Sequence, residues 1–453
     1  MIERMNPCQV GFVRECGTHV NIVRLIRRCL STYTNNQKKF KPKAILFIDF
    51  KSAYNNVNLD MLFKSLEQNK ILENDEIVFM RTLYSKTNLT IGKEKVQIHK
   101  GVMQGSIISP ALFNIFIEPL IKKLSIEFNI EDVFAYADDI AIAQSTYENA
   151  QASLNRLAKY ARTVGLLINI TKTEYMEVGD WSNHTDPDRH LSINGTKIKR
   201  ITEFTYLGGI INTTNDCHKD FLHRKSLSWV IIKKCESLWK SPLPNMDKIY
   251  FFRCIVEPVL LYGAVTWTIT ETFKHEIDAA YYSMLRHILH IHWDEHRSNN
   301  EIMQEFKIDP ITDVLSWHRL KFYGSCYPNV QGTNTTALLK RMQQQQPIHD
   351  LLFYCPWLSE SRSKGKCRIF TYVDQIIQDY GHSKANGNKS NTGCLNYIES
   401  IKKNLGDKST WYKVCDKHCK ELCPYTYERK EEHKKRRKEA LKNKVASDNK
   451  KLK

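Results

Sequence analysis

The chain has 453 residues, of which 42% are hydrophobic and 11% aromatic, so it is large enough for two or three domains and global disorder is excluded. Its formal net charge of +18 favours a polyanionic partner, first of all nucleic acid, and residues 401–453 alone carry 18 Lys and Arg against 8 Asp and Glu. The 13 cysteines show no repeating spacing and follow no signal peptide, which indicates reduced thiols in the cytosol or nucleus. No apolar stretch approaches the roughly 18 residues of a membrane span, so we expect none.

The first predicted elements are a strand, a helix and a hairpin. Residues 44–50, AILFIDF, form a short apolar run that predicts a buried strand, with Asp49 near its end. Asn58 is placed to cap a helix in NLDMLFKSLEQ. Partial alternation over residues 89–99 is typical of a hairpin.

The next segments predict a long helix and a second hairpin. In GVMQGSIISPALFNIFIEPLIKKL, Ser109 is the expected N-cap and Pro110 the first helical residue. In VFAYADDIAIA, apolar runs flank a tight acidic centre, which places Asp138 and Asp139 at the tip of a β-hairpin.

A capping box of Ser145 and Glu148 opens another predicted helix, which Gly165 ends. A strand over residues 166–170 should follow. The resulting order predicts an α+β fold in which helices back one face of the sheet.

The second half of the chain has a different pattern. From about residue 216 it turns helical, which predicts an all-α domain. After about residue 329 the chain becomes polar and interrupted, with QQQQ at 343–346 and SKANGNKSNTG at 383–393, so linkers are expected there.

Three aspartates carry the chemical hypothesis. Phosphoryl transfer to a 3′-hydroxyl uses two divalent cations about 3.5–4 Å apart, and such hard ions take carboxylate oxygens. Asp49, together with Asp138 and Asp139 on a neighbouring hairpin, would supply this cluster if the strands lie side by side. Singly, each piece has a plainer explanation, because an Asp after a strand is commonly a turn former and an Asp pair commonly lies in a solvated loop.

The ordered set of motifs is much more specific. AILFIDFKSAY with Asp49, GVMQGSIISPALFNIFI, FAYADD, GLLINITK and FTYLGG resemble, in order and spacing, five successive palm motifs of reverse transcriptases, most of all those of the non-LTR (LINE-type) retrotransposon branch. The resemblance spans roughly residues 8–330. It implies a right-hand polymerase divided into partial fingers (1–43), a palm with inserted fingers elements (44–215), an all-α thumb or connection (216–330) and a basic polar C-terminal region (331–453).

The resemblance also implies catalytic roles. Asp49 and Asp138 are the expected principal ligands of two Mg²⁺ or Mn²⁺ ions, with Asp139 in support and the carbonyl of Phe50 as a further ligand. Lys172 would neutralise or protonate the leaving pyrophosphate.

Tyr54 bears on the kind of product. It lies five residues after Asp49, where the family places an aromatic ring under the sugar so that a ribose 2′-hydroxyl would clash. RNA-templated RNA polymerases typically have a smaller polar group there and Gly at the position of Ala137. We therefore expect a DNA product, with a packed core aromatic as the alternative for Tyr54. Further residues expected at the nucleotide are Gln104, Gly105 and Tyr136, and those expected in the primer grip are Tyr206, Leu207 and Gly208.

Near the start, QVGFVRECGTHVNIVRLI resembles the fingers segment Q-x-GF-R-x-G-x-ST of the same family. Arg14 would contact template or incoming phosphate, and an exposed arginine without a partner is the alternative. Upstream fingers strands and an endonuclease domain have no counterpart, so an N-terminally truncated member is expected. Asn55 departs from the family, which often has an acid after the gate residue.

Later segments carry weaker signals. VEPVLLYGAVTWTIT and LRHILHIHWDEHRSNNEIM resemble the thumb and post-thumb region. We expect Trp267 and Trp293 in the core, with base-stacking platforms as the alternative. Cysteines 415, 419 and 423 are soft donors, but their four-residue steps place them on one helix face and disfavour zinc. HKKRRK at 433–438 stays open between a nuclear localisation signal, a nucleic-acid patch and a solvated tail.

Together these features predict an RNA-directed DNA polymerase of a non-LTR retroelement, in the nucleus or cytoplasm. It would use dNTPs, an RNA template and a DNA primer. A catalytically inactive nucleic-acid-binding remnant and a polymerase that makes RNA are the rival hypotheses. The sequence carries no signal for an oligomeric state.

Overall fold

The computed structural model describes most of the chain: residues 6–13, 16–30, 42–68, 72–85, 88–91, 93–97, 100–179, 181, 189–326, 375–376, 378–380, 400–401, 403–404 and 408–451. These residues divide into two compact units. The first extends to Asp216 and the second begins at Cys217.

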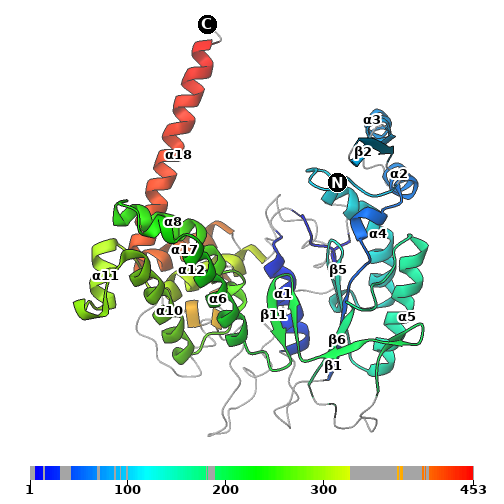
Figure 1. Cartoon of the computed structure of the whole chain (residues 1–453), viewed down its shortest axis with the longest axis horizontal. Coiled ribbons are helices and arrows are strands. Elements are labelled where there is room, and N and C mark those ends of the chain that lie inside the picture. The colour runs from blue at the N-terminus through cyan, green and yellow to red at the C-terminus, as the bar shows by residue number, and fades with distance from the viewer. Residues whose placement is uncertain are drawn as a thin grey trace. The chain divides into compact units, whose positions relative to one another are not determined.

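A five-stranded sheet forms the core of the first unit (Figure 1). Its strands are β1 (Lys43–Ile48), β4 (Val133–Tyr136), β5 (Asp139–Gln144), β6 (Glu174–Val178) and β9 (Lys199–Ile201). Across the sheet they run β4-β5-β1-β6-β9, with β6 and β9 parallel and the other neighbours antiparallel. All six residues of β1 are buried, as the apolar run predicts for a central strand.

Both faces of this sheet are covered. Leu46 and Ile48 belong to the core beneath helices α4 (Ser109–Glu127) and α5 (Tyr147–Thr163). Ile45 and Phe47 point the other way, because side chains alternate along a strand. Their face is covered by helix α1 (Thr18–Leu30) and by the hairpin of β10 (Glu203–Tyr206) and β11 (Gly209–Asn212). The mixed α and β composition agrees with the predicted class, but helices cover both faces, not one, because α1 also presents apolar residues to the sheet.

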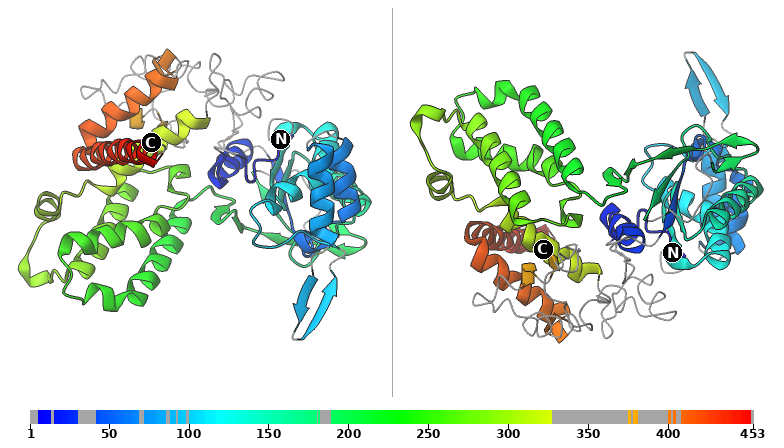
Figure 2. Two further views of the ribbon diagram at one scale, coloured as in Figure 1. Left: turned by 90° about the horizontal axis from the view of Figure 1, so that it is seen from above. Right: turned by 90° about the horizontal axis from the view of Figure 1, so that it is seen from below.

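The remaining elements of the first unit lie around this sheet. Met61 donates its N–H to Asn58 Oδ1 over 3.0 Å, so Asn58 caps the following helix as predicted. The β2–β3 hairpin also forms as predicted and stands out from the rest of the unit (Figure 2). These elements are η2 (Ala53–Asn56), α2 (Leu59–Gln68), α3 (Asn74–Ser85), β2 (Asn88–Ile91), β3 (Glu94–Gln97), η3 (Ile130–Asp132), β7 (Ser192–Ile193) and β8 (Thr196–Lys197).

Three local predictions were wrong. Ser109 is the first residue of α4 and not its N-cap, because its hydroxyl donates to the carbonyl of Met103 over 2.6 Å. Thr146 caps α5 in place of Ser145, whose hydroxyl accepts from Lys43 Nζ over 3.0 Å. Residues 166–170 form only an isolated bridge, between Ile168 and Phe50, and the strand follows later as β6.

The described elements of the second unit are helical. They are α6 (His218–Lys234), α7 (Glu236–Trp239), α8 (Asn245–Ile255), α9 (Glu257–Leu260), η4 (Ala264–Thr266), α10 (Glu271–Leu289), η5 (Trp293–Glu295), α11 (Asn299–Phe306), α12 (Ile311–Cys326), α17 (Lys408–Leu422) and α18 (Pro424–Lys451). Trp267 is buried as expected, but Trp293 is 86% exposed. The expectation that Trp293 packs in the core was wrong, because it lies in a short 3₁₀ turn whose residues are all exposed.

Helices α17 and α18 close the described chain. Cys415 and Cys419 of α17 and Cys423 after it are fully buried. Asp309 accepts hydrogen bonds from the backbone N–H groups at the start of α18, and residues 433–438 are exposed further along that helix. The predicted linkers at 343–346 and 383–393 lie outside the described residues. Within the described part of the chain, no helix combines the length and the apolar composition of a membrane span.

Candidate active site

The register of the sheet brings the three aspartates together. Ile48 of β1 pairs with Ile140 of β5, so one step further along these antiparallel strands places Asp49 across from Asp139. Asp138 directly precedes Asp139, in the two-residue turn between β4 and β5. All three carboxylates therefore stand at one end of the sheet.

The backbone of Asp49 is held by a segment that follows α5. Its N–H donates to Thr173 Oγ1 over 3.3 Å, and its carbonyl accepts from the Asn169 N–H over 2.8 Å. Thr173 is fully buried. Sequence reasoning missed both supports, although the GLLINITK motif contains Asn169 and ends one residue before Thr173. Lys172 lies in the same turn with an exposed side chain.

The surroundings of the hairpin carboxylates favour their protonated forms. Burial, and then the charges of Asp138 and Asp49, raise the pKa of Asp139 to about 6, although its side chain still reaches solvent. Burial also raises the pKa of Asp138, and the charge of Asp49 adds to this while the backbone N–H of Asp138 opposes it. Within the described residues, no Lys, Arg or His forms an ion pair with these three carboxylates.

Their chemistry suits a hard divalent cation. Carboxylate oxygens are the donors that Mg²⁺ prefers, and a cation would relieve the mutual repulsion that raises these pKa values. In the described part of the chain no three His, Cys, Asp or Glu side chains are already arranged around one ion position. Mg²⁺ usually needs only one or two carboxylates, since phosphates and waters complete its shell. The donor set therefore fits such ions. Phe50 is buried in its bridge to Ile168.

Tyr54 lies close to the same carboxylates. Burial, and then the charges of Asp138, Tyr136 and Asp139, raise the pKa of its phenol to about 12. Its ring stacks on Phe113 with centroids 4.5 Å apart and planes 7° from parallel. One face of the half-buried ring is thus fixed by packing.

Gln104 and Gly105 are tied to the Tyr54 segment. The Val102 N–H donates to the carbonyl of Tyr54 over 3.0 Å, and Gln104 Nε2 donates to Asn55 Oδ1 over 3.1 Å. Gly105 has a φ of +84°, which glycine adopts without steric cost. Asn55, where the family often has an acid, therefore pairs with the predicted nucleotide-binding turn.

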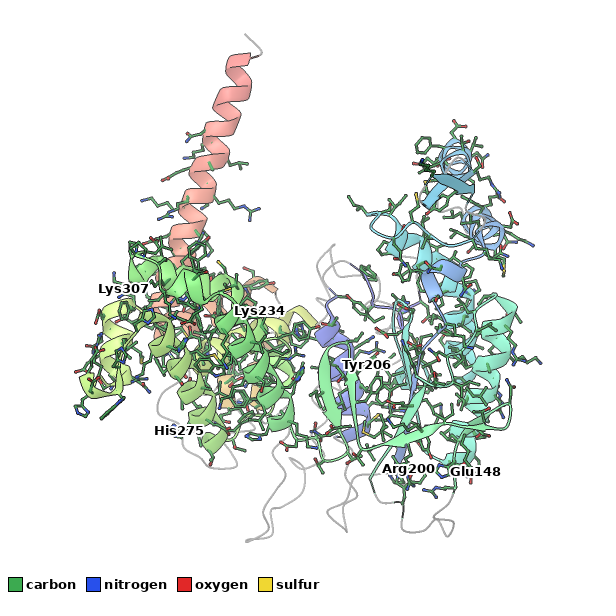
Figure 3. All side chains as sticks on the ribbon, in the orientation of Figure 1. Glu148, Arg200, Tyr206, Lys234, His275 and Lys307 are labelled. Atoms are coloured by element: carbon green, nitrogen blue, oxygen red, sulfur yellow. The ribbon has the colours of Figure 1, made fainter. Side chains whose placement is uncertain are left out.

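The segment YLGG forms a tight turn between β10 and β11. Leu207 and Gly208 both have positive φ, 49° and 81°, and Tyr206 pairs with Gly209, which defines a two-residue hairpin turn of the primed type. Tyr206, labelled in Figure 3, is buried 5.9 Å from Phe47 between ring centroids. Burial and the charge of Asp139 raise the pKa of Tyr206. A leucine in the left-handed region is uncommon and marks a tightly constrained turn.

Two predicted residues remain. Tyr136, half-buried at the end of β4, lies 5.9 Å from Phe12 between ring centroids. Arg14 lies outside the described residues. The structure thus gathers Asp49, Asp138, Asp139, Tyr54 and Tyr136 around one hairpin tip.

This chain resembles known proteins in sequence. Residues 1–211 match the family described as reverse transcriptase (RNA-dependent DNA polymerase). A retrovirus-related Pol polyprotein from type-1 retrotransposable element R2 of Popillia japonica is 25% identical over 61% of this chain and 46% of its own length. The RNA-directed DNA polymerase from mobile element jockey of Drosophila funebris is 23% identical over 68% of this chain and 34% of its own length.

The chain thus spans less than half of either of these relatives. Among solved structures, apo telomerase from Candida tropicalis is 12% identical and covers 88% of this chain and 58% of its own, with a TM-score of 0.36, which is too low to establish a shared fold. Residues 1–211 thus match the reverse transcriptase (RNA-dependent DNA polymerase) family, and the relatives similar to this chain are proteins of the non-LTR retrotransposons R2 and jockey.

Proposed function

We propose that this chain is an RNA-directed DNA polymerase that transfers nucleotides from dNTPs to the 3′-hydroxyl of a primer. The observation that carries the proposal is the cluster of Asp49, Asp138 and Asp139, which lies in a reverse transcriptase domain and has no ion-pair partner in the described protein. Carboxylates with pKa values shifted by burial and by one another are typical of functional sites.

Asp49 and Asp138 would hold two Mg²⁺ or Mn²⁺ ions, with Asp139 in support and the Phe50 carbonyl as a further donor. Bound cations of this kind lower the pKa of an attacking hydroxyl and neutralise a triphosphate. The chain's own contribution is to fix the donors before substrate arrives. The β1–β5 register and the two hydrogen bonds on the Asp49 backbone achieve this.

Other residues of the site would orient the nucleotide and the primer. The Tyr54 ring, fixed against Phe113, would lie under the sugar and exclude a 2′-hydroxyl. The exposed side chain of Lys172 is free to neutralise or protonate pyrophosphate as it leaves. The turn at Gln104 and Gly105 would line the nascent base pair, and the primer end would rest on Tyr206, Leu207 and Gly208.

The rest of the chain would bind the template and primer. We assign the palm to residues 44–215, the partial fingers to residues 1–43 and a thumb-like role to the helices of residues 216–330. The net charge of +18 supports an RNA template and a DNA primer as partners. The activity named for the jockey relative supports the same substrates.

A primer-extension assay on an RNA template tests the proposal. We expect dNTP- and Mg²⁺-dependent synthesis, and a loss of at least about a hundredfold in Asp138→Asn because the charge that binds the cation is removed. Asp75→Asn, an exposed acid in the first turn of α3, is the matched control and should extend normally. A folded wild-type chain that binds an RNA–DNA duplex but does not extend it would establish the inactive remnant instead.

The DNA product is tested separately at Tyr54. Tyr54→Ala opens the space under the sugar, so we expect ribonucleotide incorporation relative to deoxyribonucleotide to rise about tenfold or more. The ratio of kcat/KM for rNTP and dNTP measures this. A wild-type chain that already prefers rNTPs would show that the product is RNA.

A further inference from the structure

The side chain of Gln9 holds the turn that precedes the paired aspartates. Gln9 has no exposed surface. Its side-chain amide forms hydrogen bonds with both the N–H and the carbonyl of Ala137. Its Nε2 donates to the Ala137 carbonyl over 3.1 Å, and its Oε1 accepts from the Ala137 N–H over 2.8 Å. The same oxygen accepts from the Gly11 N–H over 2.9 Å. The two bonds to Ala137 join residues 128 positions apart.

Ala137 is a residue that needs such support. Its φ of 54° lies in the left-handed region, which is sterically unfavourable for a residue with a Cβ. The residue is only 3% exposed, so without Gln9 its N–H and carbonyl would be buried with those hydrogen bonds unmade. Asp138 is the next residue, and the turn sets the direction in which its side chain leaves the hairpin.

The segment around Gln9 packs closely against the Ala137 turn. The Val10 N–H donates to the Ala135 carbonyl and the Ala135 N–H to the Cys8 carbonyl, both over 3.0 Å, so the segment lies along the edge strand β4. A Cβ on Gly11 would stand 2.4 Å from the Ala137 nitrogen, a contact that only glycine avoids. The Gly11 carbonyl is fixed in turn by Asn114 of α4, over 2.6 Å.

We propose that Gln9 is a positioning residue of the active site: its amide locks the Ala137 turn and so sets the place where the Asp138 carboxylate meets Asp49. This inference rests on the proposed function. It assigns to a segment far from the palm motifs in sequence a direct part in the geometry of the site. Because Gln9 has no exposed surface, it would act through the Ala137 turn and not by contact with substrate or cation.

The test uses Gln9→Met in the full chain. Methionine fills a similar volume but makes none of the three hydrogen bonds of the Gln9 amide, so the change removes these bonds without opening a cavity. Gln9→Glu is the second variant, because it keeps an acceptor for the two N–H groups and loses the donor to the Ala137 carbonyl. The matched control is Gln151→Met. The Gln151 amide bonds the N–H and carbonyl of Ser192 in the same manner, at 2.9 and 2.8 Å, away from the aspartates.

We expect Gln9→Met to lower kcat about tenfold to a hundredfold, with KM for dNTP within about twofold of wild type, because a displaced carboxylate impairs chemistry more than nucleotide binding. Gln9→Glu should show a smaller loss of the same kind, and Gln151→Met none. Unchanged kcat in both Gln9 variants, or an equal loss in Gln151→Met, would overturn the proposal.

A second readout separates this proposal from the proposed function. Calorimetric titration with Mn²⁺ alone needs no turnover, and we expect the affinity of Gln9→Met to fall about tenfold while that of Gln151→Met is retained. If the wild-type chain does not extend primers, the proposed function fails and this titration decides the role of Gln9. Equal Mn²⁺ affinity in wild type and Gln9→Met would then refute the positioning role.

Discussion

The carboxylates at the sheet end of the first unit differ from the paired carboxylates of the second unit. In the first unit, Asp138 and Asp139 stand beside Asp49 with no cationic partner in the described residues, and burial together with neighbouring charge raises their pKa values. In the second unit, Asp379 pairs with Arg319 over 2.8 Å and accepts from Gln375 over 3.0 Å.

The second unit follows this pattern elsewhere. Asp220 accepts from Trp267 Nε1 over 2.9 Å, and Asp278 accepts from the hydroxyl and the N–H of Thr312 over 2.7 and 3.1 Å. These carboxylates have hydrogen-bond or ion-pair partners within the protein, because an unpaired buried charge would be destabilising. Those at the sheet end have no ion-pair partner in the described residues, as the proposed cation site requires. Substitutions of these paired carboxylates should therefore affect stability, and substitutions at the sheet end should affect activity.

The largest effect on stability is expected for Asp379→Asn. The change leaves the buried Arg319 guanidinium without its counter-charge, which costs about 3–5 kcal/mol of unfolding free energy. Urea unfolding followed by tryptophan fluorescence measures this in the second unit, since six of the seven tryptophans among the described residues, all but Trp181, lie there.

Asp313→Asn is the matched control. Asp313 pairs with Lys274 over 3.1 Å, but both side chains are partly exposed, so its loss should cost no more than about 1 kcal/mol. Equal losses for Asp313→Asn and Asp379→Asn would contradict the contrast drawn between buried and exposed pairs.

An intermediate effect on the free energy of unfolding, which depends on pH, is expected for His318. Burial, with Lys321 nearby, lowers its pKa to about 4 from 6.5. As the pH falls, the unfolded chain takes up a proton at His318 near pH 6.5, but the folded chain does so only near pH 4. The free energy of unfolding is therefore highest above pH 6.5 and falls by on the order of 2 kcal/mol as the pH drops towards 4. The difference in unfolding free energy between wild type and His318→Gln, measured from pH 7 to pH 4, should shrink accordingly. A difference that stays constant with pH would show that His318 titrates normally.

The smallest effect on stability is expected for Asp138→Asn, the variant that should abolish extension. Removing one of three repelling carboxylates should leave unfolding free energy unchanged within about 0.5 kcal/mol or raise it slightly in metal-free buffer. Hydrogen exchange of peptides covering β1 and β5 measures this. A clear loss of protection there would mean that Asp138 stabilises the fold, and that the sheet-end carboxylates do not differ in this respect from the paired ones.

Local pattern was sufficient for the elements that carry the aspartates. A buried strand is predicted by the apolar run before Asp49, and a hairpin by the apolar flanks of the Asp138–Asp139 pair. Both predictions need only the local pattern of apolar residues. The helical character of the second unit follows from the same kind of signal. Caps at Ser109 and Ser145 were predicted wrongly, because a hydroxyl bonds whichever partner packing brings to it, here Met103 and Lys43.

The sequence by itself therefore predicted which residues the proposed chemistry needs, and that the aspartates among them stand at the ends of strands. Only the tertiary structure decided how they are held. Asp49 is fixed by Asn169 and Thr173, and the Ala137 turn by Gln9, through hydrogen bonds across more than a hundred residues. A hydrogen bond needs two groups within about 3 Å of each other. The local sequence pattern does not predict which groups from distant parts of the chain will come that close.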